Sequence, residues 1–316
     1  MADKSKLLLL LANIEKAVVG KRQAASLLAV ALLCRGHVLI EDVPGVGKTT
    51  MVRALARSLD LPVKRIQFTP DVMPADLAGY TMYDPGEKKF LYHPGLLMSP
   101  IILADEINRA SPRTQASLLE AMEERKVTVD GKEYPLPFPF VVMATQNPAD
   151  MAGTYPLPES QIDRFLFKIR LGYPEKEVEQ RILTLRARGE AGLEEIAPVL
   201  SGAELQEMQK EVREVRVPSE LIAYIAELAS ATRASRDLSL GVSPRGSIAL
   251  LLASQAVAYV AGRDYVTPDD VRSMLPFVFS HRLILKKEAI IAGKSASGIL
   301  SGIVASVGVP GLEEKK

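Results

Sequence analysis

Residues 41–49 (EDVPGVGKT) combine glycines with a lysine and a threonine, residue types suited to binding phosphate. An apolar run precedes this stretch and helix-forming residues follow it, so we expect a turn between a strand and a helix. At such a turn, backbone N–H groups bind phosphate oxygens, the Lys48 ammonium reaches the β- and γ-phosphates, and the Thr49 hydroxyl ligates Mg²⁺. The strict pattern has glycine where this chain has Asp42, so an ordinary glycine turn is the alternative. The predicted nucleotide-binding residues of the turn are Pro44, Gly45, Val46, Gly47, Lys48, Thr49 and Thr50.

Two adjacent carboxylates, Asp105 and Glu106, end a second apolar run at residues 101–104. Asp105 would lie near Mg²⁺, directly or through water, and Glu106 could polarise the attacking water. A solvated cap or a salt-bridge pair is the alternative, but the phosphate loop favours the catalytic interpretation. Phosphoryl transfer needs positioning and charge neutralisation more than covalent chemistry. Together the two motifs predict ATP hydrolysis with Mg²⁺, rather than nucleotide binding alone.

Three more residues fit the same reaction. Asn147 follows a third apolar run, where its amide could hold the attacking water or the γ-phosphate, unless it is only a turn residue before Pro148. Arg164 precedes a further strand, and Arg245 begins a helix after Ser243 and a proline. Lone arginines are usually surface charges, so spacing alone does not assign either one.

The elements that position these residues alternate between strand and helix in the first half of the chain. Short continuous apolar runs separated by helical stretches are typical of buried parallel strands in an α/β sheet. Asp130-Gly131 predicts a tight β-hairpin across residues 126–135, since this dipeptide tolerates the positive φ of a type I′ turn. The expected strands are residues 37–41, 63–68, 101–104, 140–145 and 165–171, and the helices residues 49–58 and 111–125.

After residue 174 the strand patterns stop and helical patterns with capping residues replace them. Ser201 with Glu204 forms a capping box, and Thr267 precedes a proline at the start of another helix. We therefore predict an α/β domain over residues 1–174, an all-helical domain over residues 175–284, and a Gly/Ser/Ala-rich tail over residues 285–316.

Composition sets limits on the class of protein. The chain has 316 residues, and its 39 basic and 38 acidic side chains nearly cancel, so it has no global field for nucleic acid or an anionic membrane. Cys34 is the single cysteine, so no intrachain disulfide forms. The leucine run at residues 7–11 is too short for a signal sequence, and residues 289–309 are too rich in glycine and serine to favour a membrane span. A cytoplasmic enzyme is the expectation.

The sequence closely resembles MoxR-family AAA+ ATPases over about residues 10–284, most strongly over residues 37–173. The ADEINR and GTYPLPE strings are far more specific than the phosphate loop. Family members tolerate a residue other than glycine at position 42. The similar segments are residues 37–49, 66–76 (IQFTPDVMPAD), 104–124 (ADEINRASPRTQASLLEAMEE), 127–136, 144–148 (ATQNP) and 153–167 (GTYPLPESQIDRFLF), with Ser243-Pro244-Arg245 beyond them.

The resemblance implies the P-loop NTPase fold of AAA+ proteins, with a five-stranded parallel sheet and an all-helical lid. It also implies roles for single residues. Asn147 matches sensor 1, Arg245 matches sensor 2, which reaches the γ-phosphate from the lid, and Arg164 matches the arginine finger donated to a neighbouring subunit. Val19 and Gly20 match positions that contact adenine.

Two inserts are also implied: residues 79–97 as the helix-2 insert and residues 126–135 as the pre-sensor-1 hairpin. In related rings both face the central pore or the partner side. Gln67 matches a possible switch that holds Glu106 inactive without a partner. Arg109 is more typical of a structural or inter-subunit contact than of a catalytic group.

The family resemblance implies a hexameric ring, because a finger supplied by a neighbour makes assembly part of the active site. It also implies a chaperone-like ATPase that remodels or activates a client, with a separate partner carrying a von Willebrand factor A domain. The alternatives are a nucleic-acid motor or metal-chelatase subunit and a scaffold without turnover. Neutral charge and few basic residues in the inserts argue against the motor, and the intact Glu106 argues against the scaffold.

Overall fold

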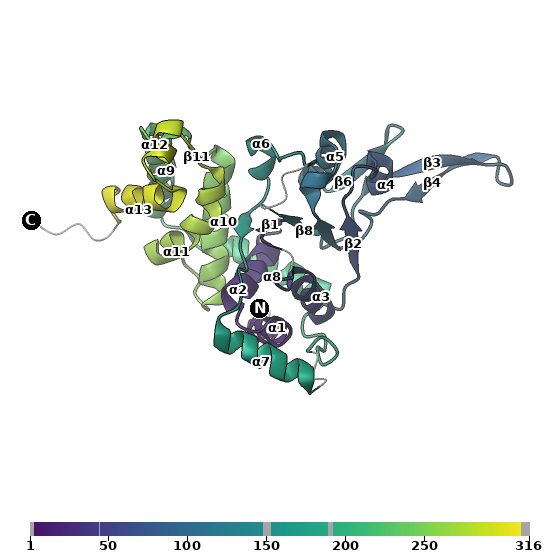
Figure 1. Cartoon of the computed structure of the whole chain (residues 1–316), viewed down its shortest axis with the longest axis horizontal. Helices are drawn as coiled ribbons and strands as arrows, with labels where there is room; N and C mark the ends of the chain where they lie inside the picture. Colours follow the sequence, from purple (N-terminus) through teal and green to yellow (C-terminus); the bar gives the residue numbers. More distant parts are fainter. Residues whose placement is uncertain (1–2, 44, 148–152, 189–191, 311–316) are drawn as a thin grey trace, which may run out of the picture.

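A five-stranded parallel sheet forms the centre of the first half of the chain, with strand order β2-β5-β8-β1-β9. The computed structural model describes residues 3–43, 45–147, 153–188 and 192–310 (Figure 1). All five predicted strands are present, so the predicted α/β fold is confirmed. Their bounds are β1 (Val38–Glu41), β2 (Val63–Gln67), β5 (Ile101–Asp105), β8 (Val141–Gln146) and β9 (Phe167–Ile169).

Helices cover both faces of the sheet because alternate strand residues enter two different apolar clusters. Leu103 packs with the cluster that contains α1 (Ser5–Ala17), α2 (Arg22–Leu33) and α3 (Lys48–Ser58). Ile102 packs on the opposite face with α4 (Pro74–Ala78) and α5 (Pro112–Glu124). Because β5 is buried on both faces, its carboxyl end, with Asp105, is held firmly. Two short helical elements complete this half, η1 (Ile107–Arg109) and α6 (Glu159–Ile162).

Two antiparallel hairpins extend from the sheet. One consists of β3 (Gly79–Asp84) and β4 (Lys89–Pro94), and Figure 1 shows it projecting away from the body of the molecule. The other consists of β6 (Lys126–Val129) and β7 (Lys132–Pro135). Asp130 and Gly131 have φ values of 48° and 75°, which confirms the predicted Asp-Gly turn. The hairpins contact each other, since Tyr92 stacks on Tyr134 with ring centroids 3.7 Å apart.

The second half is mainly helical, and the predicted caps are confirmed: Ser201 and Thr267 each form a capping box. One feature differs from the expectation, because a short antiparallel pair joins two lid segments. The helices are α7 (Lys176–Ala187), α8 (Gly202–Glu214), α9 (Ser219–Ala234), α10 (Pro244–Val260), α11 (Pro268–Phe279) and η2 (Ser280–Arg282), and the strands are β10 (Leu238–Leu240) and β11 (Ile284–Leu285).

Two further helices, α12 (Lys287–Ile291) and α13 (Ala296–Ser306), lie in the Gly/Ser/Ala-rich stretch after residue 285. The Ser295 hydroxyl caps α13 by accepting from the Gly298 N–H, and Leu300 and Ile303 are buried against the lid. In the described ranges, no helix is long and apolar enough to cross a membrane.

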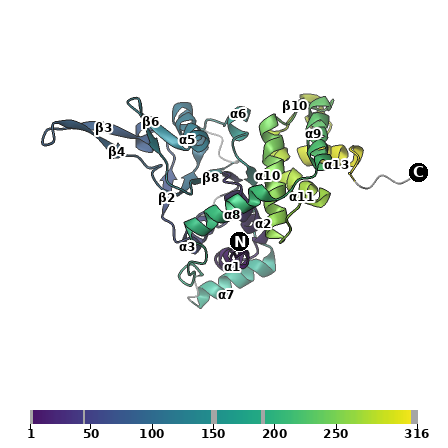
Figure 2. The same cartoon turned by 180° about the vertical axis from the view of Figure 1, so that it is seen from behind.

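The lid packs against the sheet domain through one continuous apolar core. Helices α8 and α10 both contact α2, and α11 contacts β9. Figure 2 shows α8 lying beside α2, in agreement with the contact between these two helices. The lid therefore rests on the same face of the sheet as α1–α3.

Candidate active site

The glycine-rich loop between β1 and α3 takes the conformation that a phosphate site requires. Gly45 and Gly47 have φ values of 86° and 96°, in the left-handed region that favours glycine. Gly47 precedes the first residue of α3, so the free N–H groups of this helix face the loop. Lys48, Thr49 and Thr50 form the first turn of α3. The predicted ligand Pro44 lies outside the described residues.

Asp42 holds the loop in place, which explains the departure from glycine at this position. Asp42 is 7% exposed, and its Oδ2 accepts hydrogen bonds from the N–H groups of Leu171 and Gly172, both at 2.6 Å. Oδ1 accepts from the Val43 N–H at 2.9 Å. The Lys48 Nζ donates to the Asp42 carbonyl oxygen at 2.8 Å. Asp42 therefore fastens the loop to the segment after β9.

The two predicted carboxylates lie at the end of β5, and Thr145 of β8 contacts both residues. The Thr145 hydroxyl donates to Asp105 Oδ1 at 2.7 Å and accepts from the Glu106 N–H at 2.9 Å. Glu106 has a φ of 56°, a conformation that side chains other than glycine adopt rarely. Arg109 Nε lies 2.9 Å from Glu106 Oε2, so Arg109 contacts a predicted catalytic carboxylate.

Two side chains of β2 reach the same carboxylates. Arg65 donates to Asp105 Oδ2 from Nε at 2.9 Å and from Nη2 at 2.6 Å. The Gln67 amide nitrogen donates to Glu106 Oε2 at 3.1 Å. Sequence reasoning singled out Gln67 but missed Arg65. The available signal was a charged side chain two residues before Gln67, which places both on the same face of the strand.

A cavity of about 310 Å³ brings most of the predicted residues together. A second cavity of about 220 Å³ continues from it on the other side of the loop, and the two share Gly45, Gly47 and Thr50. Val18, Val19 and Leu185 give the second cavity its apolar lining, while Gly20 lines an adjoining cavity of about 470 Å³. The first cavity is lined by Gly45, Gly47, Lys48, Thr49, Thr50, Arg65, Gln67, Asp105, Glu106 and Asn147.

The charges in the first cavity suit a divalent cation and a polyphosphate. Burial lowers the pKa of Lys48, and the carboxylates of Asp105, Asp42 and Glu106 act in the opposite direction. Thr49 and Asp105 offer the hard oxygen donors that Mg²⁺ takes, and the Arg65 guanidinium on Asp105 marks a position where positive charge is stabilised. In the described part of the chain, no three His, Cys, Asp or Glu side chains gather as a metal site.

The two predicted arginines lie together, but not beside Lys48. Arg164 Nη1 is 2.9 Å from Glu123 Oε2 on α5, and Arg245 Nη2 bonds the other oxygen of the same carboxylate. Arg164 Nη1 also donates to the Leu119 carbonyl oxygen at 2.7 Å. Both arginines line a separate cavity of about 230 Å³, between α5 and α10. Arg245 therefore does not approach the cavity of its own subunit as the sensor-2 expectation implies.

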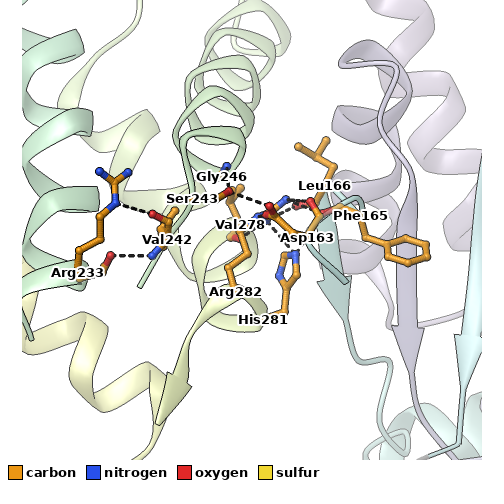
Figure 3. A network of polar contacts seen from close by, with 11 residues as sticks. Asp163, Phe165, Leu166, Arg233, Val242, Ser243, Gly246, Val278, His281 and Arg282 are labelled. Carbon is orange, nitrogen blue, oxygen red and sulfur yellow. Dashed lines mark hydrogen bonds and ion pairs between the residues drawn. The ribbon is translucent and has the colours of Figure 1, made fainter. Parts of the chain in front are cut away.

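A buried network around Asp163 joins the segment before Arg164 to the start of α10, which carries Arg245 (Figure 3). Arg282 is 6% exposed, and its Nε donates to Asp163 Oδ1 at 2.6 Å while Nη2 donates to the Phe165 carbonyl oxygen at 2.7 Å. The Ser243 hydroxyl, which caps α10, donates to Asp163 Oδ2 at 2.8 Å. Gly246 is needed here, because a Cβ would lie 2.8 Å from Arg282 Cδ. Sequence reasoning missed Arg282, which carried no local motif.

Comparisons with known proteins agree with this geometry. Residues 37–167 match the ATPase family associated with various cellular activities (AAA), and residues 230–303 match the AAA lid domain. A Cytophaga hutchinsonii crystal structure described as an ATPase is 36% identical, with a TM-score of 0.89 over 97% of this chain and 95% of its own.

Relatives that match over most of their length identify a narrower family. The uncharacterised protein YeaC of Bacillus subtilis is 51% identical over 94% of this chain and 93% of its own. Chaperone MoxR1 of Mycobacterium tuberculosis is 39% identical over 94% of this chain and 81% of its own. Protein MoxR of Methylorubrum extorquens is 33% identical over 87% of this chain and 86% of its own. The chain therefore belongs to the MoxR family of AAA+ ATPases and is an ATP hydrolase.

Proposed function

We propose that Mg²⁺–ATP binds across the two cavities that share the glycine-rich loop, and that its γ-phosphate is hydrolysed beside Glu106. The observation that carries this proposal is the 310 Å³ cavity in which Lys48 and Thr49 face Asp105 and Glu106. The apolar lining near Val19 and Leu185 suits an adenine ring, and Gly20 lies next to it.

Each residue then has one task in the reaction. The α3 N–H groups and Lys48 hold the phosphates, while Thr49 and Asp105 hold Mg²⁺, which neutralises charge on the phosphate oxygens when it is bound. Glu106 accepts a hydrogen bond from the attacking water and aligns it, and Asn147 orients that water or the γ-phosphate. The left-handed backbone of Glu106 is consistent with a strained functional residue.

The arginines are assigned to the neighbouring subunit's nucleotide. Arg164 and Arg245 share the Glu123 carboxylate and lie outside their own nucleotide cavity, so a second copy of the chain is the partner that fits them. Head-to-tail contacts of this kind generate closed rings, and a hexamer is the proposed assembly. A finger arginine supplied by a neighbour contributes on the order of 10³–10⁵ in rate in other P-loop enzymes.

The cellular task is proposed to be chaperone-like. One relative is named a chaperone. ATP binding and hydrolysis would change the angle between the sheet domain (residues 1–174) and the lid (residues 175–284) and so move the hairpins. We assign the protein to the cytoplasm, acting on a client together with a separate protein that carries a von Willebrand factor A domain. A nucleic-acid role is less well supported, because Lys89 and Lys126 of the hairpins pair with Glu87 and Glu133.

Mixing two inactive variants tests the proposed site. Arg164→Ala subunits keep an intact nucleotide cavity, and Glu106→Gln subunits keep an intact arginine pair. Phosphate release should recover partly when both are present in one assembly, and light scattering should show six copies. If proven mixed assemblies release no more phosphate than either variant alone, the trans assignment is wrong.

A capture experiment tests the partner. Glu106→Gln protein, held in the ATP state, is used to recover partners from extract, with ADP-bound protein as the control. Enrichment of a von Willebrand factor A domain protein in ATP alone supports the proposal. Recovery of nucleic acid, with salt-sensitive stimulation of wild-type hydrolysis, would favour the alternative.

A further inference from the structure

Arg65 binds Asp105, the carboxylate that would hold Mg²⁺ in the proposed nucleotide site. Strand β2 lies at the edge of the sheet, and its register with β5 places Arg65 beside Leu103 and Gln67 beside Asp105. Side chains in register point to the same face, here the face that carries α3 and the glycine-rich loop. The Arg65 guanidinium thereby reaches the 310 Å³ cavity that Lys48 and Thr49 also line.

Both guanidinium bonds go to one oxygen of Asp105. The Thr145 hydroxyl donates to Oδ1 at 2.7 Å, so Oδ2 is the oxygen that faces the cavity. Arg65 donates to Oδ2 from Nε at 2.9 Å and from Nη2 at 2.6 Å. The Asp105 side chain is 11% exposed, which makes an uncompensated charge there costly.

A Mg²⁺ ion held through Asp105 would compete with Arg65 for the same carboxylate oxygen. Mg²⁺ usually keeps several waters, so an ion held by Asp105 would need the space in front of this carboxylate. A guanidinium within hydrogen-bond distance of Oδ2 occupies that space. Each cation also satisfies the charge of Asp105, so one can replace the other.

Arg65 has room to leave. Its side chain is 52% exposed and also lines a different cavity, of about 430 Å³, on the outer side of β2. Asp76, which completes the capping box of α4, lines this outer cavity and supplies negative charge there. The side chain can therefore move from one carboxylate toward another without entering an apolar environment.

Departure of Arg65 would also reach Glu106. Arg65 Nη2 donates to Gln67 Oε1 at 3.3 Å, which orients the Gln67 amide so that its nitrogen donates to Glu106 Oε2. Without the guanidinium, the Gln67 amide keeps the Glu106 carboxylate as an acceptor but loses the contact that holds its own oxygen. Whether Arg65 is bound to Asp105 therefore affects Gln67, which donates to the proposed catalytic carboxylate of Glu106.

We propose that Arg65 is the resident cation of the nucleotide site: it neutralises Asp105 in the nucleotide-free subunit and gives way to Mg²⁺ when the metal–nucleotide complex enters. This inference rests on the proposed function, because it requires Mg²⁺–nucleotide at this cavity. Arg65 is a positioning residue here, and it makes nucleotide binding less dependent on Mg²⁺ than two bare carboxylates would.

The test is a binding experiment with fluorescently labelled ADP, in Mg²⁺ and in EDTA, on wild type, Arg65→Ala and Arg65→Lys. In Mg²⁺ the alanine variant should bind more tightly, by roughly three- to tenfold for a half-exposed ion pair, because no cation has to be displaced. In EDTA it should bind more weakly by a similar factor, since Asp105 then repels the phosphates unopposed. Arg65→Lys should fall between, and Lys64→Ala on the same strand should match wild type.

The expected changes in the ADP affinity of Arg65→Ala have opposite signs in Mg²⁺ and in EDTA, which distinguishes the proposed role of Arg65 from a purely structural one. A variant that merely distorts the site would weaken binding under both conditions, and that result, or an unchanged ratio of the two dissociation constants, overturns the proposal. Thermal melting of each variant checks folding. If wild-type protein binds no labelled ADP in either buffer, the proposed function itself fails, which is a different outcome.

Discussion

Glu106 occupies a backbone conformation that costs free energy, and the surrounding contacts hold it there. Its N–H donates to Thr145, and its carboxylate accepts from Gln67 and contacts Arg109. A side chain that is strained and contacted on several sides has a fixed direction, which a group that must align one water molecule requires.

Glu106→Gln should therefore keep nucleotide and lose turnover. The amide preserves shape but cannot act as the base, so phosphate release should fall at least about a hundredfold while ATP stays bound. Single-turnover phosphate release and nucleotide content after gel filtration measure the two properties. Brisk hydrolysis by this variant would mean that another residue activates the water.

At the residue scale, the sequence predicted the side chains whose chemistry is local. Lys48 and Thr49 follow a glycine turn, and Asp105 and Glu106 end a strand, so their positions can be inferred from a few neighbours. Arg65 was missed because its partner lies 40 residues away and on another strand. Glu123, which pairs with both Arg164 and Arg245, was missed for the same reason, because both partners are distant in the sequence.

At the element scale, patterning predicted the strands better than their lengths. The fifth strand was expected over residues 165–171 but spans Phe167–Ile169. At one end, the Phe165 N–H donates to the Ile162 carbonyl oxygen, and at the other, the Leu171 N–H donates to the Asp42 carboxylate. These two N–H groups therefore do not bond to a neighbouring strand. The β10–β11 pair was missed because two or three residues carry no readable alternation.

The joint between α6, α10 and η2 is the element-scale feature with the clearest energetic consequence. Arg282→Met would leave Asp163 without its buried partner and remove the bonds that position the segment before Arg164. We expect a loss of about 3 kcal/mol in unfolding free energy. Urea denaturation measures it, and Arg233→Met, which removes one hydrogen bond at the nearby Val242 carbonyl, is a milder comparison. Equal stability of wild type and Arg282→Met would show that the network does not hold the lid.

At the scale of the whole molecule, buried His37 links stability to pH. Burial and the nearby Arg125 lower the pKa of His37 to about 3, and its Nδ1 accepts from the Val142 N–H at 3.0 Å, so the folded state holds it neutral. In the unfolded chain a histidine titrates near pH ~6.5. Between these two values the unfolded state binds one more proton, so stability is lost as pH falls below about 6.5.

We therefore expect His37 alone to lower the unfolding free energy by about 1.4 kcal/mol per pH unit on acidification below that point. Urea titrations from pH 7 to 5 measure the slope. His37→Gln should flatten it by that amount. An identical slope in wild type and His37→Gln would contradict this origin.

The proposed division of the site between copies belongs to the scale of the whole molecule. One subunit offers the cavity around Lys48, and the Arg164–Arg245 pair lies elsewhere on its surface. The sequence singled out these residues, but only the fold shows that Arg245 lies beside Arg164, where both pair with Glu123, instead of beside the glycine-rich loop. Packing of α8 and α10 on α2 accounts for that position.

The most direct test of the central claim compares wild type with Lys48→Ala in the presence of Mg²⁺ and ATP. Lys210→Ala, at an exposed lysine of α8 that pairs only locally with Glu207, serves as the matched control. Wild type and the control should bind ATP and release phosphate, and Lys48→Ala should do neither at the same protein concentration. Phosphate release by Lys48→Ala at the wild-type rate would contradict the assignment of this cavity as the site of hydrolysis.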